Sequence, residues 1–299
     1  MRPAALFAGL TTLDVVHLVE RLPHSNEKLA SADFLVAAGG PATNAAVAFA
    51  RCGGAAELIT ALPDDALAGL VAADLARCGV RLSVEDALEP PTPTASILVT
   101  RETGDRAVVS PTGRAGLDLP AAVRLDDPAR LADSGAVLLD GYFRHLGLPL
   151  AWAARRAGVP VILDAGSFKR YTEELIAVTD LAIVSDDFAV PDTDGSADAV
   201  LEWLLAHGVR AAVVTRGGAP LVWRTVTARG EVAVDPVAVV DTLGAGDVFH
   251  GAMTFRIASL GLDLDRLPQD LEWSARVAGA SLRSFGTRAW LDQPVPGVD

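Results

Sequence analysis

Short apolar runs alternate with stretches of helical spacing along this chain, and this order limits its fold more than any other feature. AALFAG (4–9) is typical of a buried strand. PATNAAVAFARCGG (41–54) has a proline at its start and glycines at its end, as helices do. ELITAL (57–62) predicts a second strand, and a helical stretch over 64–80 follows it. This succession predicts a mostly parallel sheet with helices on both faces.

The pattern returns in the second half of the chain. A helix is predicted over 197–208 and a hairpin over 221–237. Apolar runs that end in polar residues or glycine predict further strands at 136–141, 159–166, 180–186 and 210–218. The chain has no repeats or linkers that would divide it, so we expect one domain over residues 1–299.

Two segments interrupt this rhythm and alternate apolar with polar residues, as antiparallel strands do. They cover approximately 11–39 and 92–112, and the second has a turn at Thr103–Gly104–Asp105. Because the segments flank the early helices in sequence, we expect a small β-sheet inserted into the domain and placed as a lid.

Composition narrows the class of partner. The net charge of −13 repels nucleic acid and anionic lipid, so neither is expected as a main partner. No apolar run approaches the roughly 18 residues of a membrane span, and the start of the chain lacks a secretory pattern. Two cysteines, Cys52 and Cys78, suit a reducing compartment. We therefore expect a cytoplasmic protein.

The stretch DTLGAGD (241–247) joins an apolar run to a helix that ends at Gly261. The first amides of a helix have no intrahelical acceptor, and the helix dipole makes its start positive. Gly244, Ala245 and Gly246 leave room for a phosphate to approach these amides. The loop lacks the GK[ST] ending of a Walker A loop. It predicts an anion site of another kind.

Asp247 follows this loop directly, and two interpretations of it are open. An acid in the first turn stabilises a helix by about 0.3–1 kcal/mol. Alternatively, an aspartate beside a bound phosphoryl group can accept the proton of an attacking hydroxyl. The spacing alone favours neither.

DTLGAGD and its helix resemble the C-terminal signature of the ribokinase/PfkB family of carbohydrate kinases. GGPATNAAVAFARCGG (39–54) resembles the N-terminal signature of that family, in the right order and spacing. The resemblance covers essentially the whole chain. It implies a ribokinase-like three-layer α/β/α domain with a mostly parallel central sheet, a small β-sheet lid, and an ATP-dependent sugar kinase.

The resemblance assigns roles around the glycine loop. Asp247 is implied as the catalytic base, and Gly244, Ala245 and Gly246 as the anion hole for the transferred phosphate. Asp241 is implied at a monovalent-cation (K⁺) site behind the loop. Its alternative role is structural, as a side chain that closes the turn by accepting backbone N–H bonds.

Other motifs are implied to bind the two substrates. Asp14 matches the sugar-binding aspartate of the family, and Gly39, Gly40 and Asn44 match residues that hold sugar hydroxyls. Asp140 ends a strand at the edge where open α/β sheets bind ligands. The residues implied near the ATP phosphates and ribose are Thr215, Gly217 and Gly218, and the segment implied to cover adenine is 279–286.

The chain departs from the family at two places. The N-x-x-E motif tied to Mg²⁺ is replaced by Ser185–Asp186–Asp187–Phe188, in which Asp186 or Asp187 is left to act through water. Mg²⁺ is still implied, because ATP needs a metal to screen its phosphates. The lysine typical of ribokinase proper is Pro41 here.

The motifs look closest to the ketohexokinase and sulfofructose kinase branch, which implies a ketose or ketose derivative as acceptor. Arg106 and Arg144 are candidates to meet an anionic substituent, with surface positions as the alternative. His250 is expected to pack on its helix. The alternatives are a ribokinase- or nucleoside-kinase-type enzyme, or a non-catalytic nucleotide- or sugar-binding protein. A homodimer through the lid sheets is also expected.

Overall fold

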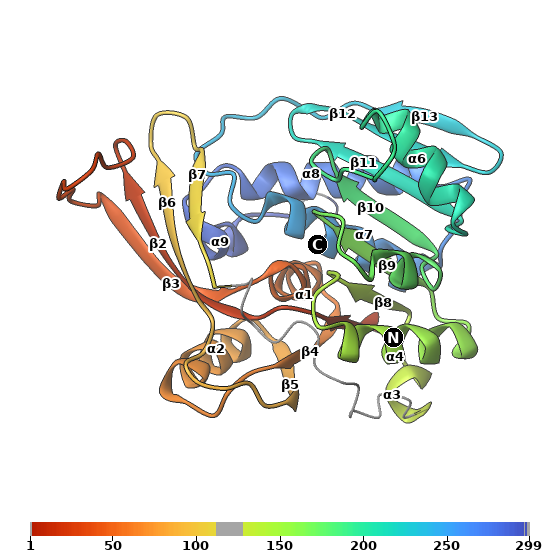
Figure 1. Ribbon diagram of the computed structural model, residues 1–299, viewed down its shortest axis with the longest axis horizontal. Coiled ribbons are helices and arrows are strands. Elements are labelled where there is room, and N and C mark those ends of the chain that lie inside the picture. Colours follow the sequence, from red (N-terminus) through yellow and green to blue (C-terminus); the bar gives the residue numbers. More distant parts are fainter. Residues whose placement is uncertain (1, 112–127, 296, 298–299) are drawn as a thin grey trace.

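The computed structural model describes residues 2–111, 128–295 and 297 (Figure 1). Within them, the central sheet has nine strands in the order β13-β12-β11-β10-β9-β8-β1-β4-β5. Its strands are β1 (Ala4–Ala8), β4 (Ala55–Ala61), β5 (Val80–Asp86), β8 (Ala136–Leu139), β9 (Val161–Ala165), β10 (Leu181–Ser185), β11 (Ala211–Arg216), β12 (Ala219–Thr225) and β13 (Arg229–Val232). The pairs from β11 to β5 are parallel, and β12 and β13 are antiparallel. The predicted mostly parallel sheet is confirmed.

Helices cover both faces of this sheet, because its buried strands place alternate side chains on opposite faces. The helices are α1 (Pro41–Arg51), α2 (Ala66–Arg77), α3 (Pro128–Ala132), α4 (Arg144–Ala157), α5 (Thr172–Ile176), α6 (Ala197–Ala206), α7 (Ala245–Leu260), α8 (Leu267–Ser281) and α9 (Gly286–Ala289), followed by a 3-10 turn, Trp290–Asp292. Leu6 and Ala8 of β1 pack on one side with α4, α5 and α6. Ala5 and Phe7 pack on the other side with α1, α2, α7 and α8. In the described ranges, no helix is long and apolar enough to cross a membrane.

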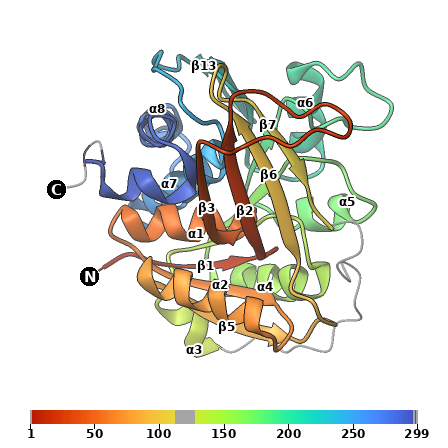
Figure 2. The ribbon, with the colours of Figure 1, turned by 90° about the vertical axis from the view of Figure 1, so that its left-hand side faces the viewer.

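A second sheet stands beside the first, and we call it the lid (Figure 2). Its four described strands follow the order β3-β2-β6-β7. They are β2 (Thr12–Val19), β3 (Asp33–Gly39), β6 (Thr94–Thr100) and β7 (Arg106–Val109). The two predicted antiparallel pairs are present, and they join through a parallel pairing of β2 with β6. Residue 112, the end of the predicted second lid segment, lies outside the described residues.

The two faces of the lid differ in what they contact. Side chains on its inner face, among them Val16 and Ile97, pack with Leu243 and Phe285, which lie outside the lid. Strand alternation places Phe34 and Val109 on the outer face, where they are 63% and 75% exposed. The inner face therefore packs on the rest of the chain, and the outer face presents some large apolar side chains to solvent.

Helices α1 and α7 pack closely because small residues meet at their contact. A Cβ on Gly251 of α7 would lie 2.3 Å from the carbonyl oxygen of Ala45 and 2.7 Å from the Cβ of Ala48. Only glycine allows the two backbones to approach this far. The close contact brings Asn44 of α1 within reach of Asp247 on α7.

Candidate active site

The predicted site residues gather where parallel strands end and two helices begin. The carboxyl ends of β8 and β9 face the start of α1, which follows Gly40, and the start of α7, which follows Gly244. The inner face of the lid covers this edge of the sheet through β2 and β3 (Figures 1 and 2). Ligands of open α/β folds bind at this edge.

The glycine loop forms the start of α7, where the amide of Ala245 donates a 3.4 Å bond to the carbonyl oxygen of Thr242. Gly244 is the N-cap residue, in a left-handed conformation at φ 74°, and no side chain caps the helix. A Cβ on Gly246 would meet no atom within 4 Å, so its backbone is open to an approaching group. The helix begins at Ala245, within the glycine loop, because glycine costs little where no intrahelical N–H bond forms. This end is suited to bind an anion.

Asp247 is the third residue of α7 and lies partly buried at this edge. Its Oδ2 accepts a 2.9 Å hydrogen bond from Nδ2 of Asn44. Burial, and next the charge of Asp164, raise the pKa of Asp247 to about 8, against the opposing effect of the Asn44 bond. A carboxyl group with a pKa near neutral is a suitable proton acceptor for a hydroxyl.

Asp164 is a site residue that the sequence analysis missed. It lies at the carboxyl end of β9, and its Oδ2 is 3.5 Å from Nδ1 of His250. Burial, and next the charge of Asp140, raise the pKa of Asp164 to about 8. The signal was present in VILDAG, where an aspartate ends a buried strand just as Asp140 does in LLDGY.

Lys169 is a second residue that the sequence analysis did not single out. Its Nζ lies 4.4 Å from the ring centroid of Tyr142. Burial lowers the pKa of Lys169, while the charges of Asp140 and Asp164 raise it. Lys169 thus adds a cation to an edge that otherwise carries several carboxyl groups.

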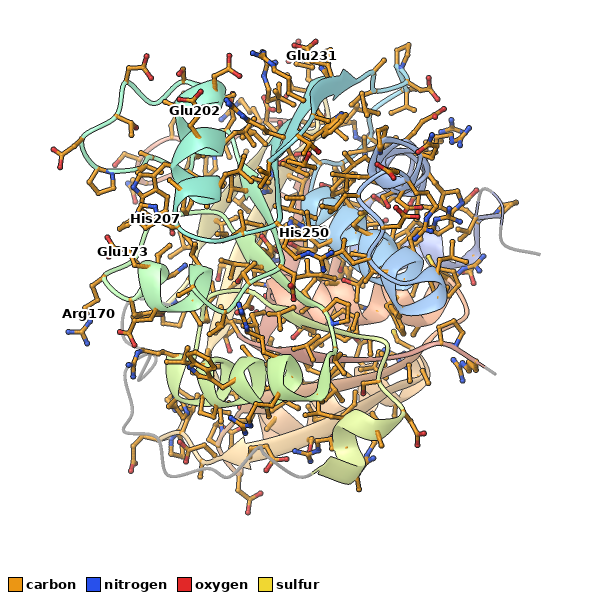
Figure 3. The ribbon with its side chains drawn as sticks, turned by 90° about the vertical axis from the view of Figure 1, so that its right-hand side faces the viewer. Arg170, Glu173, Glu202, His207, Glu231 and His250 are labelled. Carbon is orange, nitrogen blue, oxygen red and sulfur yellow. The ribbon has the colours of Figure 1, made fainter. Side chains whose placement is uncertain are left out.

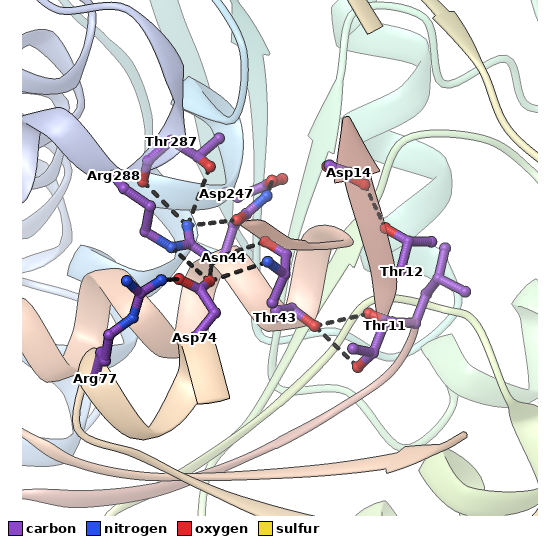
Figure 4. Close-up of polar contacts among 12 residues, drawn as sticks. Thr11, Thr12, Asp14, Thr43, Asn44, Asp74, Arg77, Asp247, Thr287 and Arg288 are labelled. Atoms are coloured by element: carbon purple, nitrogen blue, oxygen red, sulfur yellow. Dashed lines mark hydrogen bonds and ion pairs between the residues drawn. The ribbon is translucent and has the colours of Figure 1, made fainter. Parts of the chain in front are cut away.

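Asp14 projects from the inner face of β2 and is 7% exposed. Its Oδ1 accepts a 2.6 Å hydrogen bond from the hydroxyl of Thr12, and burial raises its pKa (Figure 4). A Cβ on Gly39 would lie 2.0 Å from Oδ2 of Asp14, so the carboxylate occupies the space that this glycine leaves free. Gly39 therefore has a steric reason to be glycine.

Gly40 and Asn44 lie at the start of α1. Gly40 has φ 102°, and a Cβ there would lie 2.2 Å from the carbonyl oxygen of Leu10. Asn44, one turn later, uses its amide nitrogen for Asp247 and its Oδ1 to accept a 3.3 Å bond from Arg288. The predicted sugar-binding asparagine thus touches the predicted base.

Asp140 is 2% exposed, and backbone donors surround it. Its Oδ2 accepts hydrogen bonds from the amides of Leu10 and Ala42, at 2.8 and 3.1 Å, and its Oδ1 accepts one from Tyr142 at 2.9 Å. Burial raises its pKa to about 6, against these three bonds. Asp140 therefore fixes the end of β1 and the start of α1 relative to each other.

A cavity of about 500 Å³ opens beside the glycine loop. Its lining includes the three predicted nucleotide residues, Thr215, Gly217 and Gly218, together with Ala245 and Gly246. The predicted adenine segment contributes Gly279 and Leu282, and the other apolar residues of the wall are Leu221, Val234, Pro236, Val237, Val239, Phe249, Ala275 and Ala278. An apolar wall beside open amides suits a ligand that has an aromatic base and phosphate groups.

Arg106 also lines this cavity. It points inward from β7 of the lid, and its Nη1 donates a 3.2 Å hydrogen bond to the hydroxyl of Thr242 in the glycine loop. Burial raises the pKa of both Asp241 and Asp247, and the charge of Arg106 opposes that rise. The structure thus places Arg106 with the predicted nucleotide residues.

Three other predicted residues contact protein groups or solvent. Arg144 forms an ion pair with Glu174 of α5. Asp241 accepts 2.8 Å bonds from the amides of Leu243 and Gly286, which is the structural alternative considered for it. Asp187 is exposed in the turn that follows β10.

His250 lies inside the molecule, one turn after Asp247, whereas Arg170 and Glu173 project outward (Figure 3). Its Nδ1 is 2.7 Å from the carbonyl oxygen of Gly246, and its Nε2 is 3.3 Å from that of Ile183. Burial lowers its pKa. The packing role expected for His250 agrees with these contacts.

Comparisons with known proteins agree with this geometry. The family model described as "pfkB family carbohydrate kinase" matches residues 4–293. A ribokinase of Mus musculus is 25% identical, over 96% of this chain and 91% of that protein. A fructokinase of Rhizobium leguminosarum bv. trifolii is 26% identical, over 82% and 78% respectively. The solved structure of Arabidopsis thaliana ribokinase with ribose and ATP matches with a TM-score of 0.77 at 24% identity, over 96% and 94%, and supports the fold.

Proposed function

This chain belongs to the pfkB family of carbohydrate kinases, and we propose that it transfers the γ-phosphate of ATP to a primary hydroxyl of a small ketose or ketose derivative. The ATP-dependent phosphorylation of a sugar follows from the family. The acceptor and the residue roles are our proposal. The observation that carries the residue roles is the position of Asp247, which touches Asn44 at the start of a helix that no side chain caps. The ketose acceptor rests on the resemblance of the motifs to the ketohexokinase and sulfofructose kinase branch.

In the proposed reaction, Asp14, Asn44 and the backbone at Gly39 and Gly40 hold the sugar beneath the lid. Asp247 accepts the proton of the acceptor hydroxyl as its oxygen bonds to the γ-phosphorus, and the bond between that phosphorus and ADP breaks. Negative charge on the transferred group then lies against the amides of the loop formed by Gly244–Gly246. The lid excludes water, which is the competing acceptor.

Arg106 has a position that supports a role with the phosphates of ATP. It lines the same cavity as Thr215 and Gly217 and bonds to Thr242 of the glycine loop. A guanidinium there would stabilise charge that shifts between ADP and the transferred group. We therefore propose that Arg106 contacts the phosphates of the nucleotide rather than an anionic substituent of the sugar.

A ribose-type acceptor is the second candidate, because ribokinases are among the relatives. A panel of ketoses, aldopentoses and nucleosides, each assayed for ADP formation at varied concentration, separates the two. We expect the highest kcat/KM with a ketose. A higher value with ribose or a nucleoside would overturn the ketose proposal, and ATP binding without turnover on any acceptor would favour a non-catalytic protein.

Mg²⁺ is the metal that the family implies. Within the described residues, no group of three or more His, Cys, Asp or Glu side chains is arranged to hold a metal. This fits Mg²⁺, which is usually bound through one or two carboxylates and substrate phosphates. We propose that Asp186 or Asp187, both exposed after β10, contacts the ion through water. The ion would screen the charge of the phosphates.

For K⁺, we propose a site behind the loop at Asp241. Each carboxylate oxygen there accepts one backbone N–H and keeps a lone pair. Replacing K⁺ by tetramethylammonium in the assay should lower kcat if the site exists. An unchanged kcat would contradict the proposed K⁺ site.

The outer face of the lid supports a homodimer. Phe34 and Val36 of β3 and Val109 of β7 are exposed apolar side chains on the outer face of the lid, on its two edge strands. We propose that a second copy covers this face. Light scattering should give a dimer for the wild-type chain and a monomer for Phe34→Lys, and a monomeric wild type would overturn the proposal.

A further inference from the structure

Arg288 joins four separate parts of the chain beside the candidate base. It lies in α9, and only 12% of its side chain is exposed. Its Nε donates a 3.0 Å bond to Asp74 of α2, and its Nη2 donates a 2.7 Å bond to the carbonyl oxygen of Ala38 in β3. Its Nη1 lies 3.3 Å from Oδ1 of Asn44 and 3.1 Å from the hydroxyl and carbonyl oxygens of Thr287 (Figure 4).

The contact with Asn44 determines which way the asparagine amide faces. A guanidinium has only donors, so the atom that faces it must be the amide oxygen. The NH₂ group of the same amide then points to Oδ2 of Asp247 at 2.9 Å. If the amide turned over, two acceptors would face each other at Asp247, and two donors would face each other at Arg288.

The guanidinium is itself held on its other side. Asp74 is 4% exposed, and its Oδ2 accepts bonds from Arg288 and from the amide of Ala38, both at 3.0 Å. The ion pair therefore takes up both backbone groups of Ala38 on the edge of β3 that faces away from β2. Arg288 is thereby fixed to the lid strand that ends at Gly39.

We propose that Arg288 is a positioning residue, which fixes the Asn44 amide so that it donates to Asp247 and links the base to lid strand β3. This inference rests on the proposed role of Asp247 as the base. Arg288 acts through Asn44 and does not itself touch the reacting atoms.

The Asp247 carboxyl group has several charged or titratable neighbours. Besides Asn44, the groups that affect the pKa of Asp247 are Asp164 from β9, His250 from α7 and Arg106 from β7, and Tyr142 from the turn after β8 interacts with it electrostatically. None of these four hydrogen-bonds to Arg288 in the described residues. Changing Arg288 therefore alters the Asn44 bond while leaving these four groups in place. It also removes a positive charge that opposes the rise in the pKa of Asp14 caused by burial, so the titration of Asp247 itself, rather than the pH profile alone, decides the test.

The test compares Arg288→Met with Arg77→Met. Arg77 also pairs with Asp74, through a 2.8 Å bond to its Oδ1, but it is 75% exposed and is a matched control that leaves Asn44 alone. The readouts are the pH profile of kcat/KM and the ¹³C NMR titration of the Asp247 carboxyl group. The signal of that carboxyl is assigned by its loss in Asp247→Asn.

Arg288→Met should move the titration of Asp247, and the acidic limb of kcat/KM, upward by about one pH unit. Activity below the limb would then fall about tenfold and recover at higher pH, and Arg77→Met should match the wild type. An unchanged titration, or an equal loss at every pH, would overturn the proposal.

Arg288→Lys decides the question if Arg288→Met does not fold. Lysine keeps the charge beside Asp74 but has no fork to reach Asn44 and Ala38 together, so the same upward shift is expected. A wild-type titration in this variant would contradict the proposal. The NMR readout needs no turnover, so failure of the kinase proposal would be seen separately.

Discussion

The contact between α1 and α7 gives a prediction whose size follows from the structure. In Gly251→Ala, the new Cβ would lie 2.3 Å from the carbonyl oxygen of Ala45, about 1 Å short of ordinary contact. This oxygen belongs to the backbone of α1, so the helices must separate. Overpacking of this kind costs about 1–3 kcal/mol of stability.

The same separation acts on the site. The bond from Asn44 to Asp247 is 2.9 Å long, and a shift of about 1 Å takes it beyond hydrogen-bond range. A misplacement of about 1 Å can lower a rate by about 10²-fold. We therefore expect kcat/KM of Gly251→Ala to fall about 10²-fold, together with a lower Tm.

Gly147→Ala is the matched control for this prediction. Gly147 is buried inside α4, but the nearest atom to its Cβ would be Cδ2 of Leu139 at 3.6 Å, an ordinary contact. Alanine there should stabilise the helix by about 0.5–1 kcal/mol and leave kcat/KM unchanged. Steady-state kinetics and thermal unfolding measure both variants. Wild-type kinetics and Tm in Gly251→Ala would refute the account of this contact.

Three further predictions concern the site. Burial raises the pKa of Asp247 to about 8, so ionising this carboxyl group lowers the stability of the folded protein progressively from about pH 4 to pH 8. The Tm of Asp247→Asn should therefore exceed that of the wild type by a margin that grows over this range, and a margin that is independent of pH would contradict the prediction. Gly39→Ala should displace the Asp14 carboxylate and raise KM for the sugar about tenfold while KM for ATP stays constant, which initial-rate kinetics would show; a selective change for ATP would count against it. Arg106→Gln should raise KM for ATP about tenfold; a selective rise for the sugar would assign this arginine to the acceptor.

Much of the fold was predictable because its signals are local. The strands at 4–8, 161–165 and 181–185 are apolar runs bounded by polar residues or glycine, and such runs have few alternatives in a chain of this length. The parallel pairing of β2 with β6 was not predictable. It joins segments about 80 residues apart, and nothing in either hairpin specifies its neighbour. Strand β5 and helix α8 were also not among the elements predicted from the sequence.

The site residues likewise fall into those that the sequence predicts and those that it does not. Asp247 and the glycine loop lie within one short stretch, and the motif resemblance brought Asn44 to the same place. Arg288 could not be found in this manner, since its partners Ala38 and Asn44 lie 250 and 244 residues away. Arg106 was expected beside the sugar, and its position at the nucleotide cavity depends on how the lid strand β7 pairs with β6.

The role of Asp247 is tested most directly by single-turnover transfer from γ-labelled ATP to the best acceptor of the panel. The wild type should form sugar phosphate and ADP in equal amounts. Asp247→Asn should bind ATP and sugar with unchanged affinity and transfer phosphate about 10²–10⁴-fold more slowly. Transfer at the wild-type rate in Asp247→Asn would contradict the assignment of Asp247 as the base.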